Sequence, residues 1–81
     1  MSELSRLRWR CRRGTKELDL MLEGFVLSQG KSLPSEELAL FEQVLDQQDD
    51  DLQRWLLYGE PVEVEAIRGM IQRVREHFLN R

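Results

Sequence analysis

PVEVEAIRGMIQRVREHFL, residues 61–79, carries the clearest periodic pattern in this chain of 81 residues. Its apolar side chains recur at intervals of three and four residues, at Ile67, Met70, Ile71, Val74 and Phe78. Such spacing gathers side chains on one face of an α-helix. Pro61 suits a first helical position, because the N–H that proline lacks would have no partner there. The stretch therefore predicts a final amphipathic helix that opens at Pro61 and buries one face.

Two helices are predicted near the start of the chain. The first begins after Ser2 as N-cap, is interrupted at Gly14, and places on one face Leu4, Leu7 and Cys11. Arg6, Arg10 and Arg13 fall on another face of this helix. Thr15 can cap the second helix, which ends at Gly30 and carries an apolar stripe of Leu18, Met21, Leu22 and Phe25.

Two more helices are predicted between residues 35 and 59. Residues 30–34 are predicted to form a loop, and Ser35 is predicted to be the N-cap of the next helix. The apolar stripe of that helix consists of Leu38, Phe41, Val44 and Leu45. Three consecutive acids, at 49–51, mark the start of a short fourth helix that stops at Gly59 and buries Leu52, Trp55 and Leu56. No segment alternates apolar and polar residues as a strand would. We therefore expect an all-α fold, a compact five-helix bundle in which residues 1–81 form a single domain.

Composition limits the classes of protein to which the chain can belong. Hydrophobic residues make up 41% and charged residues 33%, which fits a small soluble globular domain. No apolar run is long enough to cross a membrane, and no secretory signal is visible. One cysteine and one histidine provide neither an intrachain disulfide nor a zinc site. We expect a cytoplasmic protein that is mature from Met1.

The charge is unevenly distributed along the chain. Residues 1–34 hold seven basic and four acidic side chains, whereas residues 35–81 hold five basic and eleven acidic ones. Residues 6–16 contain six Lys or Arg and no acid. The arginines of this stretch could bind phosphates, and Trp9 among them could stack on a base. The net charge of −3, however, opposes binding to a polyanion. From composition alone, a protein-binding module and a nucleic-acid-binding protein are about equally favoured as the function of the chain.

No residue pattern favours catalysis. His77 stands near a helix end, where a dipole-compensating or solvated role is typical. Cys11 shares the apolar spacing of its helix, which indicates a buried and inert thiol despite the neighbouring arginines. The three acids at 49–51 suit a helix start without any metal ion. Nothing resembles a phosphate-binding glycine loop or a catalytic triad.

Trp9-x-Cys11-Arg12-Arg13-Gly14-x-x-Glu17-Leu18-Asp19 resembles the signature of the SdhE family, the small FAD assembly factors of succinate dehydrogenase, whose hallmark is Arg-Gly-x-x-Glu. The similarity continues downstream through Asp51-Leu52-x-x-Trp55-Leu56 and Gly59-x-Pro61 to the last amphipathic helix. It therefore covers nearly the whole chain.

The resemblance implies a five-helix protein that is not an enzyme but a chaperone-like assembly factor. Such a factor binds the flavoprotein subunit of succinate dehydrogenase, and in bacteria that of fumarate reductase, and promotes covalent attachment of FAD to a histidine of that subunit. By position in the motif, the partner-binding residues would be Arg13, Gly14 and Glu17, flanked by Trp9, Arg12 and Asp19. No cofactor would be tightly bound, and any contact of Arg13, Gly14 or Glu17 with FAD would be shared with the partner. No nucleic acid and no membrane insertion are implied.

Two alternatives remain open from the residues themselves. Arg13 and Glu17 have the spacing to pair with each other on a helix surface, with no role toward a partner. The basic first helix could instead serve a nucleic-acid-binding or antitoxin-type regulator.

Overall fold

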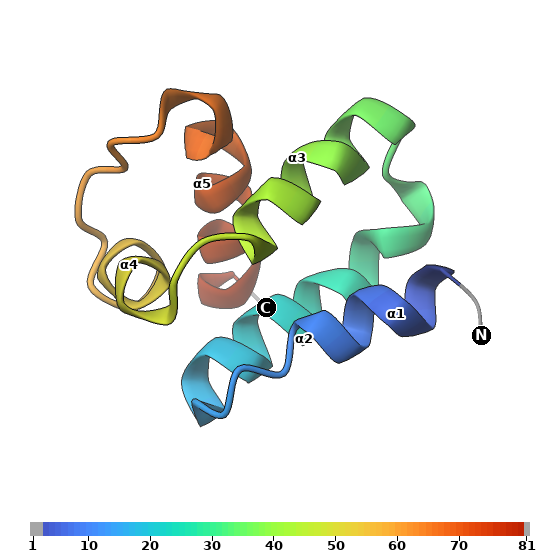
Figure 1. The fold of residues 1–81 in the computed structure, drawn as a ribbon, viewed down its shortest axis with the longest axis horizontal. Helices are drawn as coiled ribbons and strands as arrows, with labels where there is room; N and C mark the ends of the chain where they lie inside the picture. Colours follow the sequence, from blue (N-terminus) through green and yellow to red (C-terminus); the bar gives the residue numbers. More distant parts are fainter. Residues whose placement is uncertain (1–2, 81) are drawn as a thin grey trace.

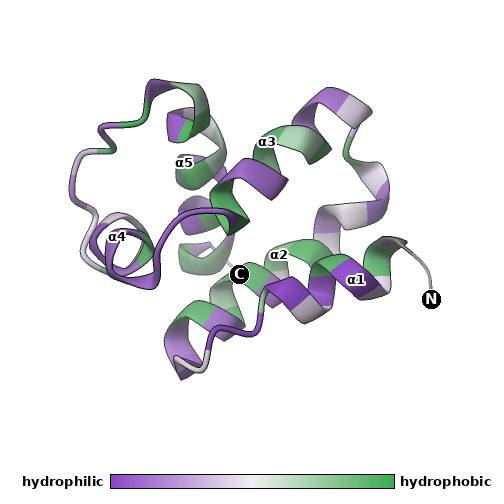
Figure 2. Ribbon diagram, in the orientation of Figure 1, coloured by the Kyte–Doolittle hydropathy of each residue, from purple (hydrophilic) through white to green (hydrophobic). Residues whose placement is uncertain are grey.

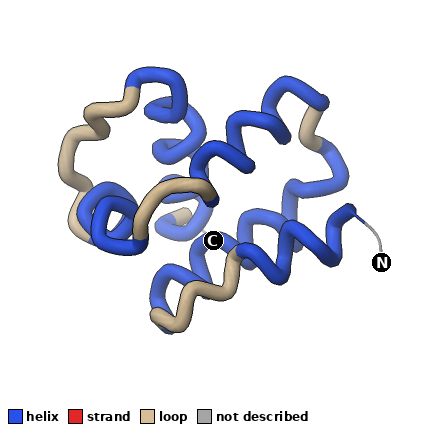
Figure 3. Tube along the Cα trace, viewed as in Figure 1, coloured by secondary structure: helices blue, strands red, loops and turns tan. Residues whose placement is uncertain are grey.

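A computed structural model describes residues 3–80 of the chain, and these residues contain helices and no strand. Five α-helices follow one another: α1 (Glu3–Arg10), α2 (Lys16–Gln29), α3 (Ser35–Leu45), α4 (Asp49–Leu52) and α5 (Glu65–Leu79) (Figures 1 and 3). The predicted all-α fold with five helices is confirmed. None of the described helices has the length and apolar content that a bilayer crossing requires.

The last helix occupies the centre of the arrangement. α5 packs against both α2 and α3, while α1 lies alongside α2 (Figure 1). A long loop leaves the end of the fourth helical segment and arcs back to the start of α5. The short connection between α1 and α2 is therefore at one side of the molecule, and the loop before α5 is at another.

One hydrophobic core joins the helices. Hydrophobic and hydrophilic residues alternate in bands along the helices (Figure 2), as amphipathic segments require. The rings of Phe25 and Phe41 stack with centroids 5.5 Å apart, which ties α2 to α3. Every residue of the predicted stripes in α2 is buried, as are all four from Ile67 to Val74 in α5, whereas Phe78 is half-buried at the rim.

The final helix begins four residues later than predicted. α5 starts at Glu65, with Val64 at its N-cap, and Pro61 belongs to the preceding loop. Val62 is buried, and its carbonyl oxygen accepts a hydrogen bond from Nε of Arg68 at 3.3 Å. The loop is therefore held against α5 by packing and by this bond, and Pro61 lies within the loop rather than at a helix start.

Helix ends differ from the prediction at several other positions. α1 ends at Arg10, so Arg13 lies beyond it in the connection. Thr15 is the N-cap of α2, as predicted, but its side chain makes no capping hydrogen bond. Ser35 is the first residue of α3 rather than its N-cap, which is Pro34, and the predicted cap at Ser2 lies outside the described residues. α2 ends just before Gly30, which opens a 3-10 turn, η1 (Gly30–Ser32), within the predicted loop.

The fourth helix changes its winding halfway. α4 continues directly into a π-helical turn, η2 (Gln53–Leu57), in which the N–H of Tyr58 donates to the carbonyl of Gln53 at 3.2 Å. Leu52, Trp55 and Leu56 are buried as predicted. The π turn ends at Leu57 with Tyr58 as its C-cap, two residues before the predicted stop at Gly59. Gly59 has a φ of +69°, a left-handed conformation that glycine tolerates. A π turn is a common feature beside functional sites.

The thiol of Cys11 gives a test of the core near α1. The side chain is fully buried, and burial raises the pKa of the thiol to about 12. Because the unfolded chain ionises nearer its ordinary value of 9.0, it binds fewer protons than the folded chain between pH 9 and 12. Folding stability should therefore be intact below pH 9 and fall as the pH rises toward 12.

We expect an alkaline urea titration followed by circular dichroism to show this loss of stability, and the variant Cys11→Ala to show less of it. We also expect the thiol to react with Ellman's reagent only as fast as the protein unfolds. Rapid labelling of the folded protein at pH 8 would contradict the burial of Cys11.

Candidate functional site

The connection between α1 and α2 carries the Arg-Gly-x-x-Glu motif. α1 ends where the N–H of Arg12 donates to the carbonyl of Trp9 at 3.1 Å. Gly14 then adopts a φ of +89°, the left-handed region in which a side chain would be strained. A Cβ at this position would meet no atom within 4 Å. Glycine is therefore needed here for the turn of the backbone, and its exposed surface stays open to an approaching partner.

Asp19 holds this turn in place. One carboxylate oxygen of Asp19, in the first turns of α2, accepts a hydrogen bond from the backbone N–H of Arg13 at 2.7 Å. The bond joins two residues that are six positions apart, on either side of Gly14. A carboxylate near a helix N-terminus is also favoured by the helix dipole. Asp19 thus orients the motif from inside the fold and is only half-exposed.

The guanidinium of Arg13 turns toward the protein interior. Its Nε donates to Asp49 at 2.8 Å, and its two Nη atoms donate to the carbonyls of Leu45 and Gln47 at 2.7 Å each. Only 16% of the side chain is exposed. The two carbonyls lie at or just beyond the end of α3, and Asp49 is the first residue of α4. The guanidinium therefore links the end of α3 to the start of α4. Arginine suits this role because its donors are planar and fixed in direction.

Glu17 lies on the exposed side of the first turn of α2. Among the described residues it has no hydrogen-bond or ion-pair partner. The surface pair of Arg13 with Glu17, considered from the spacing, is not formed, because Arg13 lies outside the helix and donates elsewhere. The structure therefore leaves the Glu17 carboxylate available to a partner and gives it no internal role.

Trp9 and Arg12 form the other flank of the motif. The Trp9 side chain is 68% exposed, and the Arg12 guanidinium carbon lies 5.7 Å from the centroid of the Trp9 ring. Nε of Arg12 is also 3.6 Å from a carboxylate oxygen of Glu23. A shallow hollow of about 220 Å³ at this end is lined by Ser5, Arg8, Trp9 and Arg12. An exposed indole beside a cation is a common anchor in protein interfaces.

The six predicted site residues therefore divide into two groups. Trp9, Arg12, Gly14 and Glu17 are exposed, and we call them the motif surface. Arg13 and Asp19 point into the fold and hold the connection that carries this surface. The partner of Arg13, Asp49, was interpreted from the sequence only as part of a helix start. The opposite charges of residues 6–16 and 49–51 were the one signal for it.

The side chains that were considered for catalysis contact other residues of the fold. The His77 ring meets Phe25 edge-on, with centroids 5.8 Å apart, in the last turn of α5. Asp49 pairs with Arg13, and Asp51 pairs with Arg54 at 3.0 Å. Within residues 3–80 no three His, Cys, Asp or Glu side chains are grouped to hold a metal ion. His77, Asp49 and Asp51 thus each have a partner within the fold.

Comparison with known proteins identifies relatives that match most of the chain. The family described as "Flavinator of succinate dehydrogenase" matches residues 5–78. A protein of Coxiella burnetii named "FAD assembly factor SdhE" is 38% identical over 71 residues, which cover 88% of this chain and 87% of that protein. Proteins with the same name from Haemophilus ducreyi and Legionella pneumophila (strain Lens) are 36% identical over 77 residues and 40% identical over 65 residues. These alignments cover 93% and 80% of this chain and 94% and 82% of the relatives.

The matches confirm the resemblance that the Trp-x-Cys-Arg-Arg-Gly-x-x-Glu stretch indicates. They extend across the described helices, from within α1 to the last turn of α5. The chain belongs to the family of succinate dehydrogenase flavinators.

Proposed function

We propose that this protein is an FAD assembly factor that binds the flavoprotein subunit of succinate dehydrogenase and promotes covalent attachment of FAD to it. The general part of this function, an FAD assembly factor of succinate dehydrogenase, agrees with the family and with the names of its relatives. Neither of them supports the nucleic-acid-binding or antitoxin-type alternative. Fumarate reductase, whose flavoprotein is related, is a second proposed client.

The observation that carries the proposal is the position of Glu17 beside Gly14. An exposed carboxylate without an internal partner lies at the start of α2, next to a glycine whose surface is open. Arg13 and Asp19 fix the backbone between them. A prearranged acceptor at a site of close backbone approach costs little ordering on binding, which favours recognition of a protein surface.

The proposed mechanism is conformational. The client supplies the histidine, and FAD is the substrate of the attachment, so this chain acts by binding one arrangement of the client more tightly than others. The hollow at the motif surface measures about 220 Å³, below the range of roughly 300–1,000 Å³ for pockets that bury a small ligand, which supports a flavin contact shared with the client. We therefore propose a non-enzymatic factor in the cytoplasm, without a tightly bound cofactor.

A reconstituted reaction tests this function. The apo-flavoprotein subunit and FAD are incubated with and without the protein, and covalent flavin is measured by its fluorescence on a denaturing gel. We expect the protein to increase the rate or yield of the fluorescent band without being consumed. No increase over the reaction without it would overturn the proposed function.

Glu17→Gln should reduce flavinylation while leaving the fold unchanged. Loss of a charge-assisted hydrogen bond costs about 1.5–3 kcal/mol, so binding to the client should weaken by roughly 10- to 100-fold. The melting temperature should stay within about a degree or two, because Glu17 has no partner in the fold. Affinity is measured by calorimetry with the apo-subunit, and stability by thermal melting.

Glu36→Gln is the matched control for this variant. Glu36 lies exposed in the first turn of α3, as Glu17 does in α2, and within residues 3–80 it too has no ion-pair partner. We expect its variant to bind and to flavinylate like the parent. Equal losses in the two variants would show a general effect of negative charge and would remove Glu17 from the site.

A further inference from the structure

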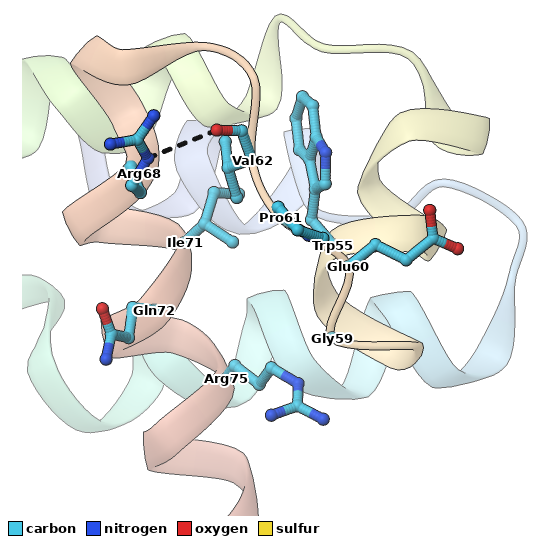
Figure 4. Close-up of a pocket in the computed structure, with 9 residues that line it drawn as sticks. All are labelled: Trp55, Gly59, Glu60, Pro61, Val62, Arg68, Ile71, Gln72 and Arg75. Carbon is cyan, nitrogen blue, oxygen red and sulfur yellow. Dashed lines mark hydrogen bonds between the residues drawn. The ribbon is translucent and has the colours of Figure 1, made fainter.

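A hollow of about 350 Å³ lies between α5 and the loop that precedes it (Figure 4). Its apolar wall includes Trp55 from η2, Val62 from the loop and Ile71 from α5. Its polar rim includes Arg68, Gln72 and Arg75, all from α5. The hollow shares no lining residue with the motif surface, so the proposed function does not account for it.

The two arginines of this rim are held by backbone carbonyls and not by carboxylates. Nε of Arg68 donates to Val62, and Nε of Arg75 donates to Leu56, both at 3.3 Å. Among the described residues neither guanidinium has an ion-pair partner, and neither has a partner at its terminal nitrogens. Arg54 and Arg73 nearby are each paired with carboxylates. Arg68 and Arg75 thus keep uncompensated charges in fixed positions.

Gly59 makes room for one of these guanidinium groups. A Cβ at this left-handed glycine would lie 2.9 Å from Nη2 of Arg75. The loop backbone therefore packs directly against the guanidinium. The carboxylate of Glu60, which also lines the hollow, is engaged with Arg54 at 3.4 Å and points away from α5 in Figure 4. The third rim residue, Gln72, donates to the carboxylate of Glu76 at 3.5 Å. The charged side chains that α5 itself contributes to the lining are the two arginines, Arg68 and Arg75.

The spacing of the rim residues sets the shape of a ligand. Arg68, Gln72 and Arg75 are separated by four and three residues, so they lie along one side of α5. Seven residues at 1.5 Å each place the two arginine Cα atoms about 10 Å apart along the helix. Ile71 and Val62 are nearly buried, and the atoms by which they line the hollow are apolar. An elongated molecule with an anionic group at each end and an apolar middle would match this pattern.

We propose that the hollow beside α5 binds a small organic dianion, a dicarboxylate with an apolar middle. Arg68 and Arg75 bind the two carboxylates through their terminal nitrogens, and Trp55 and Ile71 contact the carbon chain. The volume of about 350 Å³ lies within the usual range of roughly 300–1,000 Å³ for small-ligand sites. Guanidinium groups are the side chains best shaped to bind carboxylates.

Trp55 can report the binding directly. The chain has two tryptophans, and Trp9 is remote from the hollow, so Trp9→Phe leaves Trp55 as the single indole fluorophore. This variant is titrated with succinate, adipate and suberate, which differ in chain length, and with octanoate, which has one carboxylate. We expect saturable changes in fluorescence, with suberate bound about tenfold more tightly than octanoate because a second charge-assisted contact forms. Adipate and succinate should bind progressively more weakly than suberate.

Arg68→Gln and Arg75→Gln should each reduce the affinity for suberate to about that for octanoate. Lys31→Gln, which removes one positive charge from an exposed residue outside the hollow, should leave it unchanged. Circular dichroism and melting of each variant verify that the fold persists. Affinity should also fall as salt is added, because the contacts are ionic.

Three results would overturn the proposal. One is an equal response to suberate and octanoate, and another is full affinity in both arginine variants. The third is saturable binding of an acidic peptide, such as Asp-Leu-Leu-Asp, by a protein that does not respond to any dicarboxylate, since that would assign the hollow to a protein partner.

Discussion

Trp55→Ala should remove most of the stability of the protein. The indole is only 2% exposed and packs in the single core beneath α5. Truncation of a buried tryptophan removes its transfer free energy and opens a cavity, at a cost of about 3–5 kcal/mol. A domain of 81 residues has a total stability near the low end of roughly 5–15 kcal/mol. Urea denaturation followed by far-ultraviolet circular dichroism would measure the loss.

Trp9→Ala is the control with the same change in chemistry. Trp9 is 68% exposed, so its removal should alter the free energy of unfolding by less than about 1 kcal/mol. Ile71→Ala, on the buried face of α5, should cost about 2–5 kcal/mol. If Trp55→Ala melted within a degree or two of the parent, the packing of η2 against α5 would be wrong.

The sequence predicts the helices well where an apolar stripe repeats. The stripe from Leu18 to Phe25 in α2 and that from Ile67 to Val74 in α5 are buried as expected. Burial of one apolar face contributes most to the stability of a helix in a folded protein, and the spacing of apolar residues is enough to predict that face. The order and approximate length of all five helices follow from these stripes and from the glycines between them.

Positions set by contacts between distant segments could not be predicted in this way. Pro61 has the local signature of a helix start, but burial of Val62 and its bond to Arg68 keep the chain irregular until Val64. The π turn at Trp55 has no local signature either. Each depends on how the loop meets α5, which residue spacing does not encode.

Contacts between distant segments also limit how much of the candidate site the sequence can predict. The motif identifies which residues matter, and the structure exposes Glu17 and Trp9 as expected of a binding surface. Arg13, however, donates to Asp49, which is 36 positions away in the sequence. Arg13 was expected to bind the partner, and its guanidinium donates to a carboxylate and two carbonyls of its own chain. Its contact with the flavoprotein stays a prediction, and the structure adds a role in holding the motif.

Arg13→Ala should lower both the stability of the protein and its flavinylation activity. The change removes three short hydrogen bonds, and it leaves the Leu45 and Gln47 carbonyls without these donors. Unsatisfied, half-buried acceptors and an unpaired Asp49 should cost about 2–4 kcal/mol in total. The end of α3 and the start of α4 would lose the side-chain link between them, and the turn at Gly14 would keep only the bond from the Arg13 backbone N–H to Asp19. Thermal melting and the gel assay for covalent flavin measure the two losses.

Two further variants separate an anchoring role from direct contact with the client. Arg13→Lys should recover only part of the stability, because one ammonium cannot serve Asp49 and two carbonyls at once. A double-mutant cycle of Arg13→Ala with Asp49→Ala should give a coupling energy of at least about 1 kcal/mol, because the two side chains are in contact. A coupling near zero would contradict the anchor.

Restoring the fold of Arg13→Ala decides what the guanidinium contributes to flavinylation. Trimethylamine N-oxide favours the compact state, so it should refold this variant without replacing the missing side chain. If Arg13 acts by holding the α1–α2 connection, activity should return with the folded fraction, whereas Glu17→Gln should stay impaired because its fold was never lost. Activity that stays low in a refolded Arg13→Ala protein would assign the guanidinium to the client interface itself. Full activity without any osmolyte would remove Arg13 from both roles.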